Sequence, residues 1–108
     1  MKHRVFIHPD AEADLDAIIA AIAAEYPLTA RRVAERFADQ IRTLASFPRL
    51  GALAREHGSY ELELRQSNIY AYRVIYTIAR RTVHVLRIIH ASRQNLRPGD
   101  LPRLPDGP

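Results

Sequence analysis

The residues best suited to chemistry in this sequence are an arginine inside one apolar run and a histidine and an arginine after another. Arg73 lies in the middle of IYAYRVIYTI, residues 69–78, and His90 and Arg93 stand at and after the end of TVHVLRIIH, residues 82–90. A guanidinium recognises carboxylate or phosphate with a planar fork of donors, and a histidine changes charge near neutral pH. These residue types indicate either contacts to an anionic partner or structural ion pairs.

Two carboxylates, Glu61 and Glu63, alternate with leucine in the preceding run YELELRQ. A glutamate on a neighbouring strand can pair with Arg73, which would contribute a few tenths to about one kcal/mol. The sequence favours this structural pair with Glu61 or Glu63. A carboxylate is also one of the few groups here that can take a proton from a ribose hydroxyl, so a general-base role stays open as the alternative.

Other chemistries find little support. Ser92 lies close to His90, but no nucleophile elbow and no third triad member is visible. The chain has no cysteine, and its five histidines show no metal-ligand spacing. The acidic residues near the start, among them Asp10 and Asp14, are expected to complement the dipole of a helix rather than to hold a metal. Neither a cofactor nor a metal is therefore predicted.

The charge of the chain is unevenly distributed. The formal net charge is +4, and residues 64–99 contain seven arginines and no Asp or Glu. Such a basic half suits an acidic partner, either nucleic acid or an acidic protein segment, although a solvated surface explains it equally well. The apolar runs are too short for a signal peptide or a membrane span, so a soluble cytoplasmic protein is expected.

The hydrophobic periodicity changes along the chain. A short β-type run at residues 3–8 precedes a helix that Pro9 begins and that ends near residue 26. Thr29 can cap a second helix that ends before Pro48. From residue 60 the period is two, which predicts a three-stranded meander with turns at residues 67–68 and 80–81.

This order of elements predicts an α+β domain of two layers. An N-terminal strand, an antiparallel helical hairpin and a three-stranded antiparallel meander follow one another, with the helices packed on one face of the sheet. Tyr70, Tyr72, Val74 and Tyr76 are expected on the helix-covered face. The opposite face, if open to solvent, presents apolar residues such as Ile75 to a partner. Residues 1–94 are predicted to form the domain and residues 95–108 a mobile proline-rich tail.

The sequence resembles the RelE/ParE toxin superfamily of bacterial type II toxin–antitoxin systems. The segments that carry the resemblance are AEADLDAIIAAIA, FPRLG, LELR, YRVIY and VLRIIHASR, and they occur in this order over nearly the whole chain before the tail. EADLDAII and IIHASRQN are closer to the ParE branch, also known for plasmid stabilisation. The resemblance implies the same two-layer fold.

That branch implies a non-catalytic inhibitor of DNA gyrase that a cognate antitoxin neutralises, without a membrane partner. The side chains that would contact target or antitoxin are Arg65, Arg73, Arg87, His90, Arg93 and Arg97. The alternative is a RelE-like endoribonuclease that cuts messenger RNA on the ribosome. Its candidate catalytic residues are Arg73, Arg93, His90, Glu61 and Glu63, although the two glutamates stand where that branch has lysines, and carboxylates repel a phosphate backbone. A degenerate domain without toxicity is the third possibility.

Overall fold

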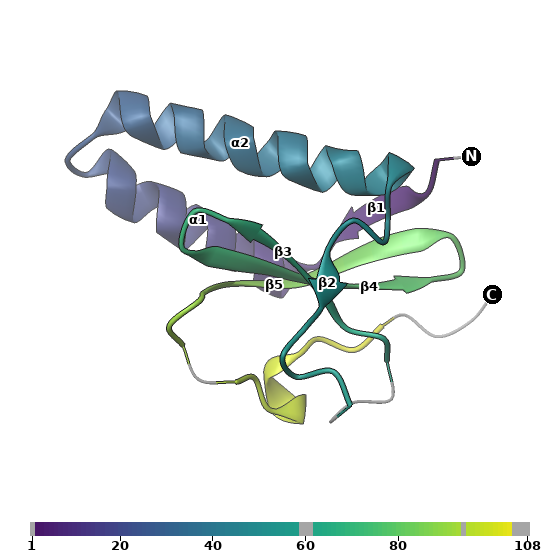
Figure 1. The fold of residues 1–108 in the computed structure, drawn as a ribbon. Helices are drawn as coiled ribbons and strands as arrows, with labels where there is room; N and C mark the ends of the chain where they lie inside the picture. Colours follow the sequence, from purple (N-terminus) through teal and green to yellow (C-terminus); the bar gives the residue numbers. More distant parts are fainter. Residues whose placement is uncertain (1, 59–61, 94, 105–108) are drawn as a thin grey trace.

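Two helices and a five-stranded sheet form two layers in the computed structural model, which describes residues 2–58, 62–93 and 95–104 (Figure 1). The strands are β1 (Arg4–Ile7), β2 (Ala52–Leu53), β3 (Arg65–Ile69), β4 (Tyr72–Ala79) and β5 (Thr82–His90). They lie in the order β1-β5-β4-β3-β2, and β1 runs parallel to β5 while all other neighbours are antiparallel. The predicted α+β fold is confirmed, with two strand pairings, β1 with β5 and β2 with β3, that the sequence analysis did not include.

The helical hairpin consists of α1 (Pro9–Ala23) and α2 (Pro27–Ser46). Each helix has a proline at its start, where the missing N–H is harmless and the fixed φ angle is already helical. The second helix therefore begins at Pro27, and Thr29 is not its cap. It ends before Pro48, as predicted.

The core between the helices and the sheet contains the tyrosines and aliphatic residues that face inward on β4. Tyr72, Val74, Tyr76 and Ile78 all belong to it, together with Phe37 of α2. Alternation along the strand thus places these residues on the predicted face. Tyr70 is an exception, because it lies in the turn after β3 with 67% of its surface exposed.

The first hairpin of the meander differs from its prediction. The turn lies at Tyr70 and Ala71, and β3 extends from Arg65 to Ile69, so Ser67 and Asn68 are strand residues. The Ser67 hydroxyl is buried and accepts a hydrogen bond of 2.7 Å from the Gln40 side chain of α2. This tertiary contact overrides the turn propensity of Ser and Asn.

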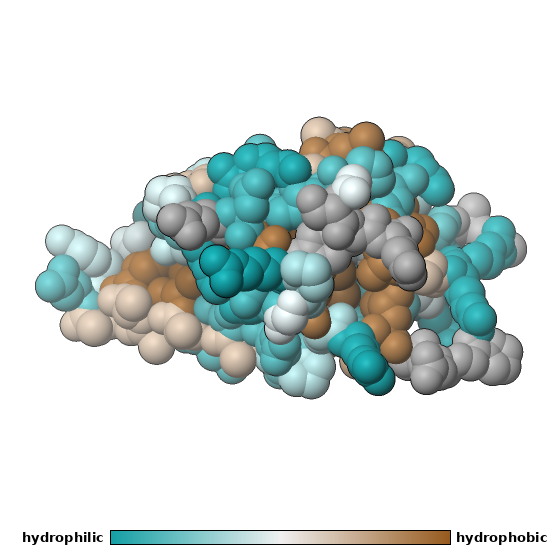
Figure 2. Space-filling view, turned by 90° about the horizontal axis from the view of Figure 1, so that it is seen from below, coloured by the Kyte–Doolittle hydropathy of each residue, from teal (hydrophilic) through white to brown (hydrophobic). Residues whose placement is uncertain are grey.

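The outer face of the sheet, away from the helices, is not open to solvent. A second buried cluster covers it, formed by Ala54, Leu64, Ile75, Leu86, Ile89 and Leu96. The loop before β3 and the segment after β5 supply its cover, and both lie below the sheet in Figure 1. Seen from that side, apolar residues appear as separate patches among hydrophilic ones (Figure 2). The expectation that the outer face is open to solvent is therefore wrong for the part of the face that this cluster occupies.

Residues 95–104 lie within the segment predicted as a mobile tail. Leu96 is 5% exposed, and Leu101 and Leu104 pack against the same outer cluster. A one-turn 3-10 helix, η1 (Pro98–Asp100), lies between them. The domain boundary at residue 94 stays a prediction. Within the described ranges, neither α1 nor α2 has the length and apolar character needed to cross a membrane.

Candidate functional site

Arg73 is held by a carboxylate beneath the outer face. Its Nη1 and Nη2 lie 2.9 Å from Oε1 and Oε2 of Glu56, and both side chains are at least 98% buried. Nη1 also donates to Oε1 of Gln66 at 3.0 Å. Arg73 therefore forms a bidentate structural ion pair, as favoured from the sequence, but with a different partner.

Glu56 was missed by the sequence analysis because it lies in an aperiodic loop. It is nevertheless the only acidic residue between Pro48 and Tyr60. Its Oε2 also accepts a hydrogen bond of 2.9 Å from the backbone N–H of Leu96. The hydrogen bonds from Arg73, and with a smaller effect that from Leu96, lower the pKa of Glu56 to about 2 against the opposing effect of burial. One carboxylate thus joins the loop, β4 and the C-terminal segment.

Glu63, one of the two residues predicted to pair with Arg73, pairs with Arg65 instead. Glu63 lies 2.8 Å from Nε of Arg65, and this hydrogen bond lowers the pKa of the Glu63 carboxyl. Arg65 also donates from Nη1 to the carbonyl oxygen of Gly51 at 2.7 Å. Glu61 lies outside the described residues. Arg65, a predicted contact residue, is therefore engaged within its own fold.

Arg87 is engaged as well. Its Nε and Nη2 lie 2.7 and 3.0 Å from the two carboxylate oxygens of Asp14 on α1, and Nη1 donates to the carbonyl oxygen of Asp100 at 2.8 Å. The hydrogen bonds with Asp14 raise the pKa of Arg87 despite burial. Asp14 also accepts a hydrogen bond of 2.9 Å from the N–H of Ile88, on the part of β5 that extends beyond β1. Asp14 thus has a tertiary role, while the acidic residues in the first turn of α1 are Asp10 and Glu12.

Accessible polar and aromatic side chains gather near the end of β5. They belong to a surface, here named the His90 surface, that consists of Tyr70, Tyr72, His90, Ser92 and Arg93. The Tyr72 and His90 rings contact edge to face at 5.3 Å, and the N–H of Ala91 donates to the Ala71 carbonyl. Nδ1 of His90 accepts from the backbone N–H of Ser92 at 3.1 Å and lies 2.6 Å from its hydroxyl. The neutral ring therefore carries its proton on Nε2, and this nitrogen has no hydrogen-bond partner among the residues that the structure describes.

Arg93 and Arg97 are both exposed. The Arg93 carbonyl accepts a hydrogen bond of 3.1 Å from Arg55, while its guanidinium makes no ion pair with any residue that the structure describes. The backbone N–H of Arg97 donates to the Asp100 carboxylate at 2.8 Å, and Arg97 itself is exposed. Together with His90, these arginines are the predicted contact residues that remain accessible.

Of the alternative catalytic residues that the structure describes, His90 and Arg93 lie close together, whereas Glu63 and Arg73 are placed elsewhere. His90 pairs with Tyr72 at one end of the sheet, whereas Glu63 precedes Arg65, which pairs with Tyr76 toward the other end of β4. Arg73 is near His90 in register but is buried beneath the outer face. Glu63 and the buried guanidinium of Arg73 are therefore separated from His90 and Arg93, and Glu61 lies outside the described residues. No group of His and acidic side chains with metal-binding geometry occurs in the part of the chain that the structure describes.

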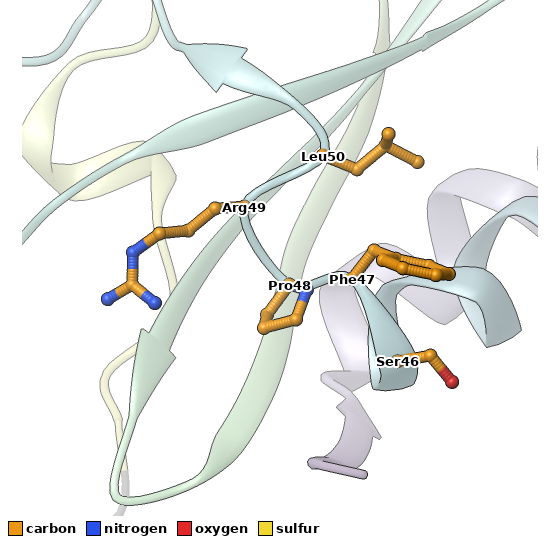
Figure 3. Close-up of a pocket in the computed structure, with 5 residues that line it drawn as sticks. All are labelled: Ser46, Phe47, Pro48, Arg49 and Leu50. Atoms are coloured by element: carbon orange, nitrogen blue, oxygen red, sulfur yellow. The ribbon is translucent and has the colours of Figure 1, made fainter. Parts of the chain in front are cut away.

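A second exposed feature follows α2. Residues 46–50 line an open hollow of about 400 Å³, and Figure 3 shows Phe47 and Leu50 directed to the same side while Arg49 points away. Phe47 and Leu50 are 62% and 56% exposed. Two hydrogen bonds to the buried Tyr76 of β4 hold the loop of residues 48–51 in place. The Tyr76 hydroxyl donates to the Pro48 carbonyl at 2.7 Å and accepts from the Gly51 N–H at 3.0 Å.

Comparison with known proteins gives a consistent picture. The profile of the family described as "ParE toxin of type II toxin-antitoxin system, parDE" matches residues 5–95. The chain superposes on a chain from the chromosomal ParDE toxin–antitoxin system of P. aeruginosa with a TM-score of 0.69 and 18% identity, over 82% of this chain and 96% of that one. This second likeness concerns the fold alone.

Another similar structure belongs to the toxin–antitoxin complex RelBE2 from Mycobacterium tuberculosis. It has a TM-score of 0.53 and 26% identity, over 83% of this chain and 99% of that one. No curated protein sequence matches the chain.

Proposed function

Because the chain belongs to the ParE toxin family of type II toxin–antitoxin systems, we propose that it is a toxin that inhibits DNA gyrase by binding and not by catalysis. The observation that carries this proposal is the burial of Arg73. A guanidinium that is 2% exposed and held by Glu56 cannot reach the phosphate of a messenger RNA. A gyrase inhibitor acts in the cytoplasm, where a cognate antitoxin would neutralise it.

The His90 surface is the part of the fold that best suits contact with the target. It combines an exposed tyrosine, a histidine that can donate from Nε2 and an exposed arginine without an ion-pair partner among the described residues. Tyrosine and arginine are the residue types most often found among the energetically important residues of protein interfaces. The antiparallel pairing of β4 with β5 holds the backbones of Tyr72 and His90 in place, so these two residues need little ordering on binding.

A direct test compares the two toxin mechanisms on purified components. The full chain is added to a gyrase supercoiling assay and, separately, to programmed ribosomes on which cleavage of messenger RNA is measured. We expect supercoiling to fall and the RNA to remain intact. The double variant His90→Ala, Arg93→Glu should weaken gyrase inhibition about tenfold or more, while the charge reversal Arg32→Glu on the far part of α2 should leave it unchanged.

The RelE-like alternative has one observation in its favour, the similarity to the RelBE2 complex. It predicts cleaved RNA at unchanged DNA topology, with loss of cleavage in the His90 and Arg93 double variant. That result would replace the gyrase proposal with an endoribonuclease. An inert chain in both assays, with native circular dichroism, would indicate a fold without toxicity.

A further inference from the structure

Two histidine rings are hydrogen-bonded to each other where β1 meets β5. Nε2 of His8 lies 3.0 Å from Nδ1 of His84, although the two residues are 76 positions apart in the chain. His8 directly follows β1, and its backbone N–H donates to the Val85 carbonyl at 3.0 Å. The two rings therefore join the end of β1 to β5 through their side chains, at a place outside the His90 surface.

The surroundings of the two rings are largely apolar. His8 is 3% exposed, and His84 is half-buried. The Phe6 ring packs edge-on against both, at centroid distances of 4.6 Å from His8 and 6.1 Å from His84. Thr77, the residue opposite His84 on β4, is uncharged and 1% exposed. A charge on either ring would therefore lose much of its hydration.

His8 is also the N-cap residue of α1, and its carbonyl accepts the Glu12 N–H at 3.0 Å. The positive end of a helix dipole disfavours a cation at this position. Burial, and with a smaller effect the neighbouring His84, lowers the pKa of His8, although the Asp10 carboxylate in the first turn of α1 raises it. Burial lowers the pKa of His84 as well. Both rings are therefore neutral at neutral pH.

The elements around the two histidines contribute few further charges to this site. Arg4 is exposed, and strand alternation puts it on the same face of β1 as the residue at position 6. On β5, Arg87 is held by both carboxylate oxygens of Asp14. The second helix approaches β1 at its other end, where the N–H of His3 donates to a carbonyl of α2. Asp10 is thus the acidic group that acts on His8.

The hydrogen bond between the two rings depends on how many protons they carry. In the neutral pair, one ring donates its only N–H and the other accepts with a bare nitrogen. A first added proton binds the far nitrogen of the donating ring, so that the bond stays but a charge enters the apolar site. A second added proton must bind the accepting nitrogen. Two N–H groups and two positive charges then face each other at the place of the 3.0 Å contact, which is repulsive.

We propose that His8 and His84 form an acid-sensitive latch, here named the histidine latch, which holds β1 on β5 while both rings are neutral and releases β1 as they take up protons. Local release suits β1, because it has four residues and lies at the edge of the sheet (Figure 1). In the released state the histidines have their ordinary pKa of 6.5, so the latch contributes its full stability above this pH and loses it as the pH falls. The inference goes beyond the proposed function, because it adds a response to acid that does not depend on the target.

The test follows the histidine latch in the full chain by NMR spectroscopy. The ring nitrogen shifts of His8 and His84 report their protonation, and both rings should protonate below the ordinary pKa of 6.5. The backbone amides of Arg4 and His8 donate to Arg81 and Val85, so their hydrogen exchange reports release of β1. We expect their protection factors to fall at least about tenfold from about pH 7 to about pH 5, which is the effect of one pKa unit. The protection factor of Val74, in the core, should change less than about twofold.

Variants assign the acid response to the two rings. The double variant His8→Gln, His84→Gln keeps polar side chains that do not titrate, so the protection factor of the Arg4 amide should change less than about twofold over the same pH range. The single variant His84→Gln, at the more accessible ring, should show an intermediate response and gives the comparison if the double variant does not fold. The matched control His57→Gln removes an exposed imidazole outside the latch, and it should leave the acid response unchanged.

Three outcomes would overturn the proposal. Protonation of both rings without loss of protection at Arg4 and His8 would show that β1 stays on β5 whatever the charge of the pair. An equal loss of protection at Val74 would indicate unfolding of the whole domain and not release of one strand. An undiminished acid response in the His84→Gln and double variants would assign it to other groups. Since none of these readouts involves gyrase, failure of the histidine latch remains distinct from failure of the toxin proposal.

Discussion

Arg73 and Glu56 make a bidentate ion pair across the outer face of the sheet, between a strand and a loop seventeen residues earlier in the chain. A buried pair of this kind contributes little compared with apolar residues of the same size, but the loss of one partner leaves a buried charge without compensation. The pair therefore contributes little net free energy of unfolding, but it restricts how the loop that contains Glu56 can pack on the sheet.

The variant Glu56→Gln should lower the free energy of unfolding by about 3–5 kcal/mol, because it removes the countercharge of a buried guanidinium. Urea denaturation of the purified protein measures this loss. The double variant Glu56→Leu, Arg73→Met should recover part of it. Equal stability of the single variant and the wild type would show that the pair is not a structural constraint.

The lowered pKa of Glu56 predicts that the free energy of unfolding decreases in acid. The pKa of Glu56 is about 2 in the folded chain and near the ordinary value of 4.5 when unfolded. The unfolded state therefore binds the proton first, and the contribution of Glu56 is present above pH 4.5 and is lost as the pH falls toward 2. Other carboxyl groups titrate in this range, so the informative quantity is the difference between wild type and Glu56→Gln. That difference should narrow steadily through this window.

The variant Asp14→Ala should cost about 2–3 kcal/mol, since Asp14 accepts hydrogen bonds from Arg87 and from the N–H of Ile88. Glu12→Ala, at an exposed position in the first turn of the same helix, serves as the control and should cost less than about 1 kcal/mol. Chemical denaturation of both variants would separate the tertiary contact from the helix-dipole effect. Equal losses would mean that only the dipole matters.

The variant Tyr76→Phe should lower stability by about 1–3 kcal/mol, because the Pro48 carbonyl and the Gly51 N–H both lose their partner. Exchange of the Gly51 amide should accelerate at the same time. The exposed Tyr26 offers a matched change, and Tyr26→Phe should stay within about 0.5 kcal/mol of the wild type. A slow Gly51 amide in Tyr76→Phe would contradict the proposed anchoring of this loop.

The helical hairpin and the meander could be predicted because their signals are local. Periodicity placed Val74 and Tyr76 on the helix-covered face, and Pro9 marked the start of α1. The partner of Arg73 could not be predicted in this way. Glu56 lies in a loop without periodicity, and its contact with Arg73 depends on how that loop folds over the sheet.

The cover of the outer face was missed for a related reason. Leu96, Leu101 and Leu104 are spaced irregularly among prolines, and such composition is typical of mobile segments. Their packing follows from specific contacts, such as the hydrogen bond between the N–H of Leu96 and Glu56. The misplaced turn at Ser67 likewise reflects a contact with Gln40 that no local pattern reveals.

The parallel pairing of β1 with β5 determines when the toxin can fold during its synthesis. β1 cannot join the sheet until residues 82–85 of β5, its partner strand, have also been made. The helical hairpin has local contacts and can form earlier, but Phe37 and Leu44 then lack the strands that bury them. A nascent chain that ends before β5 is therefore unable to assemble this sheet and exposes apolar surface that invites chaperones or aggregation. The His90 surface likewise cannot form before residues 82–90 have been made and have paired with β4.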